Sequence, residues 1–163
     1  MPIIRVIINK TMNSLLKPFF CFMRVEIGNW ILEKAKGQVE NDKVVPVRMI
    51  ANRLKVDKEG QEILPQAFNK DTVASFLKTG IVDWHHQSVL GKTAEARAKA
   101  IIGKPTGFKW EKEDGVELPV VYANLTRNHP IVKDSILPHL EADQDVFAAS
   151  VGGSVKKAAR VHD

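Results

Sequence analysis

An Asp-Gly step between two long apolar runs constrains the fold of this chain more than any other feature. The runs Ala100 to Trp110 and Val116 to Leu125 flank the polar segment Glu111 to Gly115, which ends in Asp114-Gly115. Asp-Gly favours a tight turn between antiparallel strands, because both residues tolerate positive φ. The sequence therefore predicts a β-hairpin over 100–125 and a sheet whose neighbouring strands run antiparallel.

The remaining elements are predicted to be short strands and short helices. Segments rich in β-formers indicate strands at 44–51, 81–84 and 145–151, and Gly60 marks a turn at 57–61. Helix caps indicate a helix from Asn69 or Asp71 through Leu77 that Gly80 ends, and a helix from Asn128 that Pro138 limits. We expect an α+β domain with an antiparallel, barrel-like sheet and short helices, rather than a doubly wound parallel sheet.

Residues 1–43 differ in pattern from the rest of the chain. Apolar side chains recur at helical spacing from Leu15 to Leu32, and the polar segment Gln38 to Lys43 follows. We therefore expect an N-terminal helical arm or propeptide with a linker over 1–43, before a protease-like domain over 44–163. The alternative is that this segment is the first core helix of a single domain.

Composition and charge exclude several classes of protein. Apolar residues make up 44% of the 163 residues and charged residues 26%, which is ordinary globular composition. The net charge of +5 is mild, and the basic tail of Lys156, Lys157 and Arg160 has no aromatic residues, which argues against nucleic acid as a partner. Charges interrupt the apolar stretch Ile3 to Ile31, so we expect no membrane-spanning segment. No small-x-small cleavage site follows the apolar run Phe19 to Met23, so we expect no signal peptide. The single cysteine, Cys21, excludes an internal disulfide, and a soluble intracellular protein is the expectation.

Two segments carry residues suited to nucleophilic catalysis. His85 and His86 follow the predicted strand at 81–84, and Ser150 precedes Gly152-Gly153 at the end of the last predicted strand. A serine hydroxyl needs a base such as histidine, and adjacent glycines let backbone amides stabilise an oxyanion. Taken alone, a serine before two glycines is more often a turn. Neighbouring histidines on a strand point to opposite faces, so both cannot easily serve one site.

A metal site is the rival interpretation of the histidines. It would use His85, His86, His129 and His139. No HExxH or CxxC spacing supports such a site, and neighbouring histidines diverge. We therefore expect no metal and no cofactor.

The order of motifs along the chain resembles that of the prohead (capsid maturation) proteases of tailed phages, which share their fold with the herpesvirus assemblin proteases. The resemblance runs from Val47 to Val155. In chain order it comprises an acidic glycine turn with Glu62, His85-His86-Gln87, Gly91-Lys92, the hairpin, the proline-containing helix and Ala149-Ser150-Val151-Gly152-Gly153.

The resemblance implies an endopeptidase that cleaves scaffold and capsid proteins by serine acyl transfer, inside the assembling procapsid in the host cytoplasm. It assigns the base to His86, which precedes Gln87, and the nucleophile to Ser150. His85 matches a position that is often Asn or Asp in the family, and Ser154 fits the pattern poorly. Herpesvirus relatives are active as dimers, so homo-oligomerisation is left open.

The third catalytic member is a departure from the family's pattern. In the family it lies downstream of the serine, whereas here 13 residues follow Ser150 and only His162 and Asp163 are candidates. We expect a C-terminally truncated, self-processed or degenerate form of the domain. The alternative function is a non-catalytic protease-fold scaffold or assembly module of the procapsid. If the chain is catalytic, the strand ends at His86 and Ser150 should lie side by side, with an imidazole nitrogen about 3–4 Å from the hydroxyl.

Overall fold

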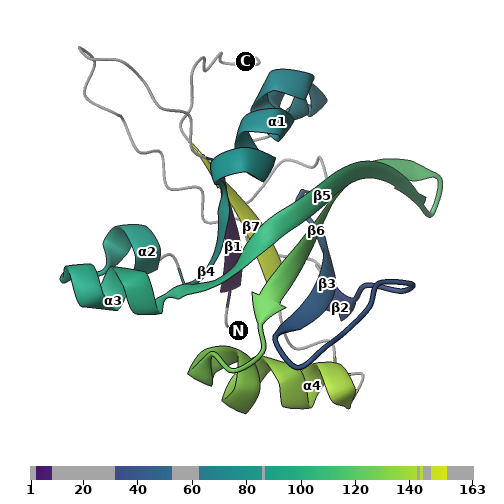
Figure 1. The fold of residues 1–163 in the computed structure, drawn as a ribbon. Coiled ribbons are helices and arrows are strands. Elements are labelled where there is room, and N and C mark those ends of the chain that lie inside the picture. Colours follow the sequence, from purple (N-terminus) through teal and green to yellow (C-terminus); the bar gives the residue numbers. More distant parts are fainter. Residues whose placement is uncertain are drawn as a thin grey trace, which may run out of the picture.

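The computed structural model describes residues 3–8, 32–52, 63–85, 87–142, 144 and 148–153. It is an α+β structure whose sheet curls strongly into a half-barrel (Figure 1). Seven described strands form this sheet in the order β2-β3-β6-β5-β4-β1-β7. Their bounds are β1 (Ile3–Ile8), β2 (Leu32–Lys34), β3 (Val44–Ile50), β4 (Ile81–Trp84), β5 (Ile101–Glu113), β6 (Val116–Thr126) and β7 (Ala148–Gly153). Every pair is antiparallel except β1 with β7, so the predicted α+β class and antiparallel, barrel-like sheet are confirmed.

The β5–β6 hairpin forms as predicted and is the longest feature of the sheet. Asp114 and Gly115 make the turn with φ values of 48° and 83°, as a tight hairpin turn with two left-handed residues requires. The register shifts between Pro105 and Gly107, where β5 carries one unmatched residue. Such a bulge increases local bending, which is consistent with the marked curl of the hairpin in Figure 1.

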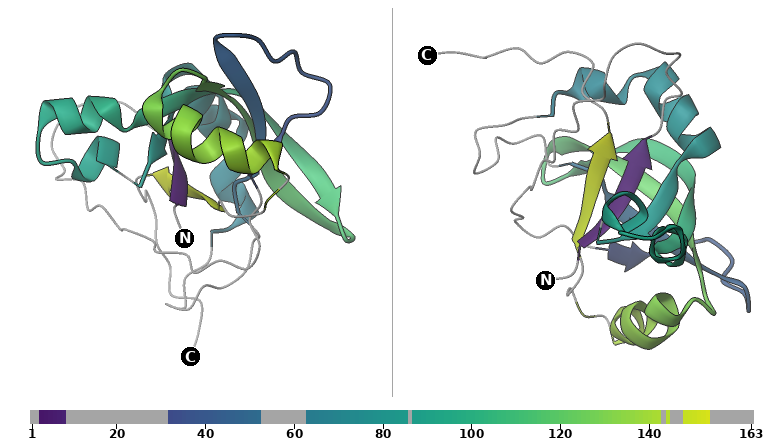
Figure 2. Two further views of the ribbon diagram at one scale, coloured as in Figure 1. Left: turned by 90° about the horizontal axis from the view of Figure 1, so that it is seen from below. Right: turned by 90° about the vertical axis from the view of Figure 1, so that its left-hand side faces the viewer.

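The core fills the inside of the curl. Alternate residues of β3 and β6 are buried there, as expected for strands with one face on the core. Helix α1 (Lys70–Thr79) contributes Phe76, which is 1% exposed, and the helical segment after β6 contributes Val132 and Ile136. The two helical segments lie at opposite ends of the curled sheet (Figures 1 and 2).

Local capping explains where α1 begins and ends. The Asn69 side chain accepts a hydrogen bond from the Thr72 N–H, and the Gly80 N–H donates to the Phe76 carbonyl. The predicted helix and the strand at 81–84 are therefore confirmed. A short 3₁₀ turn, η1 (Pro65–Phe68), precedes α1.

Two short helices after β4 were not expected from the sequence. These are α2 (Gln87–Leu90) and α3 (Ala94–Lys99), which project from the sheet as a pair (Figure 1). The Thr93 hydroxyl caps α3 by accepting from the Ala96 N–H.

Pro138 does not limit the last helix, contrary to the sequence prediction. The π-helical turn η2 (Val132–Ile136) leads directly into α4 (Leu137–Glu141), which contains Pro138. Proline lacks an N–H and clashes with the carbonyl four residues earlier in a regular α-helix. The wider turn resolves this conflict, because the Leu137 N–H donates to the carbonyl of Val132, five residues back.

The first 43 residues do not form a separate arm where the structure describes them. β1 pairs with both β4 and β7, and β2 pairs with β3, so both strands are part of the single sheet. Both segments join the sheet because its neighbouring strands satisfy the backbone N–H and C=O groups of β1 and β2. The helical periodicity falls mostly on residues 9–31, which lie outside the described residues, as does the predicted turn at 57–61.

Candidate functional site

The two segments predicted to carry the site belong to the same half of the sheet. β1 lies between β4, which leads towards His86, and β7, which carries Ser150. Arg5 of β1 is opposite Asp83 on one side and opposite Ser150 on the other. The expectation that these two strand ends lie side by side in the sheet of a catalytic chain is therefore not met, because the N-terminal strand β1 pairs with both.

The predicted site residues differ in how far the structure describes them. Ser150 lies in β7, parallel to β1 and one register position from the row that contains Trp84. His86, Ser154, His162 and Asp163 lie outside the described residues. The His86–Ser150 distance and the third catalytic member thus stay predictions.

The connection from β4 to α2 is two residues long and sharply bent. β4 ends at Trp84 and α2 begins at Gln87, so His85 and His86 alone join them. His85 has a φ of 53°, a left-handed conformation that is uncommon outside glycine and several-fold enriched for His. Its ring packs edge-on against Trp84 with 4.8 Å between centroids, and partial burial lowers the pKa of the His85 imidazole.

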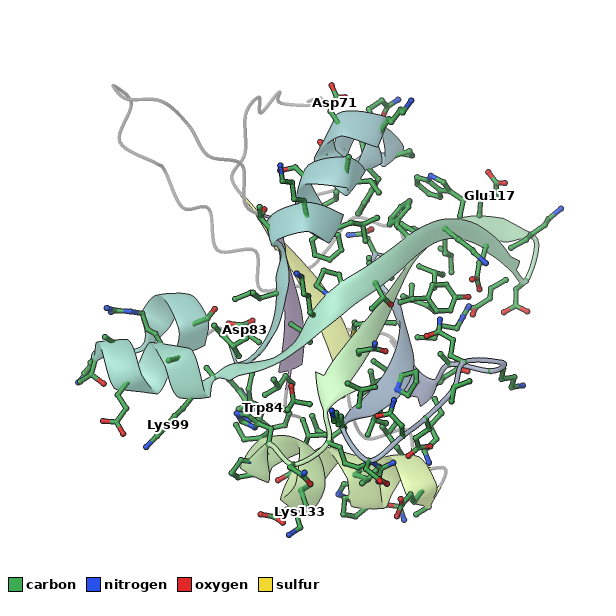
Figure 3. All side chains as sticks on the ribbon, viewed as in Figure 1. Asp71, Asp83, Trp84, Lys99, Glu117 and Lys133 are labelled. Carbon is green, nitrogen blue, oxygen red and sulfur yellow. The ribbon has the colours of Figure 1, made fainter. Side chains whose placement is uncertain are left out.

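Asp83 is the charged residue of this region that sequence reasoning missed. It is 0% exposed, and its carboxylate Oδ2 accepts hydrogen bonds from both the backbone N–H of Ser88, at 3.2 Å, and the Ser88 hydroxyl. Asp83 and Trp84 lie beside the α2–α3 pair, where Figure 3 labels them. A carboxylate is buried only when hydrogen bonds replace water, and Ser88 supplies two of them. An acid inside the short apolar strand Ile81–Trp84 was the signal for such a contact.

Gly91 and Arg97 secure the far end of α2. A Cβ at Gly91 would lie 2.6 Å from the Gln87 carbonyl oxygen, so the glycine permits this close approach. The Arg97 guanidinium donates to the Gly91 carbonyl at 3.0 Å. The Gly91-Lys92 motif therefore builds the turn between α2 and α3.

His129 joins two elements and is distant from the β4–α2 connection in sequence. Its Nδ1 accepts from the Ile131 N–H at 3.3 Å, and its Nε2 lies 2.9 Å from the Lys99 carbonyl. Because Nδ1 is the acceptor, Nε2 carries the hydrogen and donates. His139 instead contacts Gln144 at 2.7 Å. Both histidines are thus engaged near the ends of the last helical segment.

A separate polar cluster surrounds Arg48 on the outside of the sheet. The Arg48 guanidinium pairs with Glu33 at 3.1 Å, Glu111 at 2.9 Å and Glu113 at 2.8 Å. The Tyr122 hydroxyl donates to Glu111, and this hydrogen bond raises the pKa of Tyr122. Burial alone would raise the pKa of Glu111, but the hydrogen bonds from Tyr122 and Arg48 outweigh it and lower that pKa. These contacts tie β2, β3, β5 and β6 together.

Within the described ranges, no three His, Cys, Asp or Glu side chains are grouped as metal ligands would be. In the same part of the chain, no helix has the length and apolar character needed to cross a membrane. Comparisons with protein-family models, curated proteins and solved structures give no match for this chain.

Proposed function

We propose that the protein is a serine endopeptidase of phage head maturation that cleaves scaffold and capsid proteins inside the assembling procapsid. The ordered set of motifs from Val47 to Val155 is the sequence basis for this proposal. The proposal requires an α+β fold with a curled, mostly antiparallel sheet. It also includes the proposal that the topology of this sheet is that of the herpesvirus proteases.

The arrangement of β4, β1 and β7 is the observation that carries the proposal. β4 and β7 flank one strand, so their backbones are two strand spacings, about 10 Å, apart. Trp84, the last residue of β4, shares a register row with Ala149, next to Ser150. Ser150 shares its own row with Asp83, so the connection that contains His86 begins two residues along β4 from that row, and the proposed dyad requires the His86 imidazole to reach back across β1 towards Ser150.

The proposed mechanism is acyl transfer. The Ser150 hydroxyl attacks the scissile carbonyl while His86 takes its proton, which forms a C–O bond and an oxyanion. Backbone N–H groups beside Gly152 and Gly153 stabilise that oxyanion. The intermediate collapses with cleavage of the C–N bond, and His86 returns the proton to the leaving amine. Water then hydrolyses the acyl-enzyme by the same steps.

The first prediction is loss of cleavage on substitution of Ser150. Incubation of the purified chain with its cognate capsid or scaffold protein, read by mass spectrometry, should show defined cleavage products. Ser150→Ala should lower the rate by at least about 10⁴-fold, because the nucleophile is absent. Ser154→Ala is the matched control and should cleave as wild type. Cleavage by Ser150→Ala at the wild-type rate would rule out the assignment.

The position of β1 favours one second candidate, a non-catalytic protease-fold scaffold of the procapsid. Because β1 lies between β4 and β7, the two segments are two strands apart in the sheet rather than adjacent, which a binding module tolerates without any requirement on the distance between His86 and Ser150. On this alternative the wild-type chain binds scaffold or capsid protein in a pull-down but leaves it intact. Intact substrate together with saturable binding would establish the scaffold function instead of the protease.

A further inference from the structure

The outer part of the β5–β6 hairpin has an unpaired edge. β4 pairs with β5 only at Ile101 and Gly103, and among the described residues no other backbone pairs with that side of β5 from Lys104 to Glu113. The hairpin extends beyond the rest of the sheet in Figure 1. An exposed edge of this kind offers its N–H and C=O groups to a further strand.

The register of the hairpin shows which residues direct their backbone groups to this edge. Trp110 lies opposite Pro119 of β6, and the Pro119 carbonyl accepts from the Ala51 N–H on the far side of β6, next to β3. In an antiparallel sheet the N–H and C=O of one residue point to the same side, so Trp110 and Pro119 do not bond each other. The backbone groups of Trp110 therefore point outward, and so do those of Phe108 and Lys112, because the direction alternates along a strand.

The charges along this edge are self-complementary about Trp110. Lys109 lies over the Tyr122 ring at 5.5 Å, and the Tyr122 hydroxyl donates to Glu111, so the two charged side chains share one face. When β5 of a second copy runs antiparallel with Trp110 on the two-fold axis, Lys109 of each copy faces Glu111 of the other. Registers with Lys109 or Glu111 on the axis instead place two like charges opposite each other, which is destabilising.

Trp110 lies on the opposite face of the hairpin. Its side chain is 37% exposed, and its ring packs edge-on against both Phe68 and Phe108 with 5.9 Å between centroids. In the symmetric register it faces the same residue of the second copy, and aromatic pairs across neighbouring strands are stabilising. The pairing thus covers an aromatic ring that one copy leaves partly in water.

We propose that this edge is the interface between two copies of the chain, with the β5 strands paired antiparallel about Trp110. Trp110 then exchanges N–H···O bonds with its own copy, and Phe108 exchanges them with Lys112. A two-fold interface of this kind is closed, so it gives dimers and not filaments. One strand pair buries less than the roughly 1,200 Å² of a standard stable interface, so the dimer is weak and depends on concentration. The inference does not depend on the protease proposal.

Analytical ultracentrifugation over a range of protein concentrations tests the interface. The wild-type chain should pass from monomer to dimer as the concentration rises. Lys109→Glu places two carboxylates opposite each other and should raise the Kd of the dimer by about 10-fold or more. Lys112→Glu is the matched control: it makes the same change of charge in the same strand but faces Phe108. It should change the Kd by less than about 3-fold, because only screened long-range charge is altered.

Three outcomes of this experiment would overturn the inference. They are a wild-type chain that stays monomeric up to about 1 mM, an assembly larger than a dimer, and a Lys109→Glu chain that dimerises as tightly as wild type. Circular dichroism shows whether each variant is folded before its Kd is compared.

Cross-linking tests the same register without any change of charge on Lys109. In a chain whose single cysteine is removed by Cys21→Ser, Trp110→Cys places two thiols opposite each other, with Cα atoms about 5.5 Å apart. A short bismaleimide should therefore link this variant into a covalent dimer. Lys104→Cys is the control: it is exposed in the same strand, but its two copies lie roughly 40 Å apart and should not be linked. Linking of Lys104→Cys but not of Trp110→Cys would show that the copies meet in another way.

Discussion

Gly103 lies in β5 at a place where the strand closely approaches its neighbour β6. It pairs with Val82 of β4 and with Leu125 of β6. A Cβ at this position would lie 2.5 Å from the Asn124 carbonyl oxygen and 3.0 Å from the Leu125 Cα. Because both contacts are backbone, neither can move aside without distorting the sheet. At Gly107, four residues further on, an added Cβ would have the Tyr122 Cβ as its nearest neighbour, at 3.6 Å.

These contacts predict that two alanine substitutions in one strand have different effects on the free energy of unfolding. Gly103→Ala should lower the free energy of unfolding by about 1–3 kcal/mol, the cost of overpacking. Gly107→Ala should change it by less than about 0.5 kcal/mol, because a methyl group fits there. Urea denaturation of the three chains measures both values. A Gly103→Ala chain as stable as Gly107→Ala would contradict the close approach.

Within the element formed by β5 and β6, the Tyr122–Glu111 bond gives stability a defined pH dependence. The pKa of Glu111 is lowered in the folded state, so the ionised form stabilises the fold above the ordinary value of about 4.3 and this contribution is lost as pH falls through the lowered pKa. The pKa of Tyr122 is raised, so its contribution is present below about 10 and is lost as pH rises through the raised pKa.

Tyr122→Phe should therefore destabilise the protein most between about pH 5 and pH 9. The expected loss in that window is about 1–2 kcal/mol of unfolding free energy, because the Glu111 carboxylate loses a hydrogen bond. The difference between wild type and variant should shrink as the pH falls through the lowered pKa of Glu111, because protonation removes the charge that the hydroxyl bond stabilises. Urea titrations across this range measure it, and a difference independent of pH would show that the hydroxyl does not act through the carboxylate.

The elements that sequence analysis predicted depend on local chemistry. Asp114-Gly115 specifies its turn through backbone preference, and Asn69 begins α1 through its own side chain. The missed elements lack such signals. α2 has four residues, too few for a hydrophobic period, and without α2 the partner of Asp83 could not be foreseen. The helix beyond Pro138 was missed because a π-turn depends on the surrounding packing rather than on residue type.

For the molecule as a whole, the position of β1 was the feature that sequence analysis could not predict. Its pairings join Ile4 to Trp84 and to Ala149, contacts between residues far apart in the chain. Local patterns say which segments are strands but not which strands pair. For this reason the sequence analysis expected the segments of His86 and Ser150 to be adjacent in the sheet, whereas β1 lies between β4 and β7. That both segments belong to one sheet could be predicted. The roles of His86 and Ser150 stay predictions.

Val6→Pro tests whether β1 joins β4 to β7. Val6 pairs with Val82 and Val151, and proline removes the backbone donor from a strand that has a partner on each side. The substitution should cost about 1–3 kcal/mol of unfolding free energy and speed amide exchange in β7 and β4.

Exchange in β3 and β6, on the other half of the sheet, should change little. Val39→Pro, at a residue that is 84% exposed, is the control and should leave exchange in β7 as in wild type. Unchanged protection of β7 in Val6→Pro would contradict the described strand order.

The order of strands also bears on how the protein is made. β1 is synthesised before both of its partners, β4 and β7, which follow only after long stretches of chain, and β7 is the last of the described strands. The β5–β6 hairpin and its pairing with β3 need only nearer segments, so they can form while translation continues. The half of the sheet that carries both proposed catalytic segments is therefore completed only after β7 has been made, when the other half can already be folded.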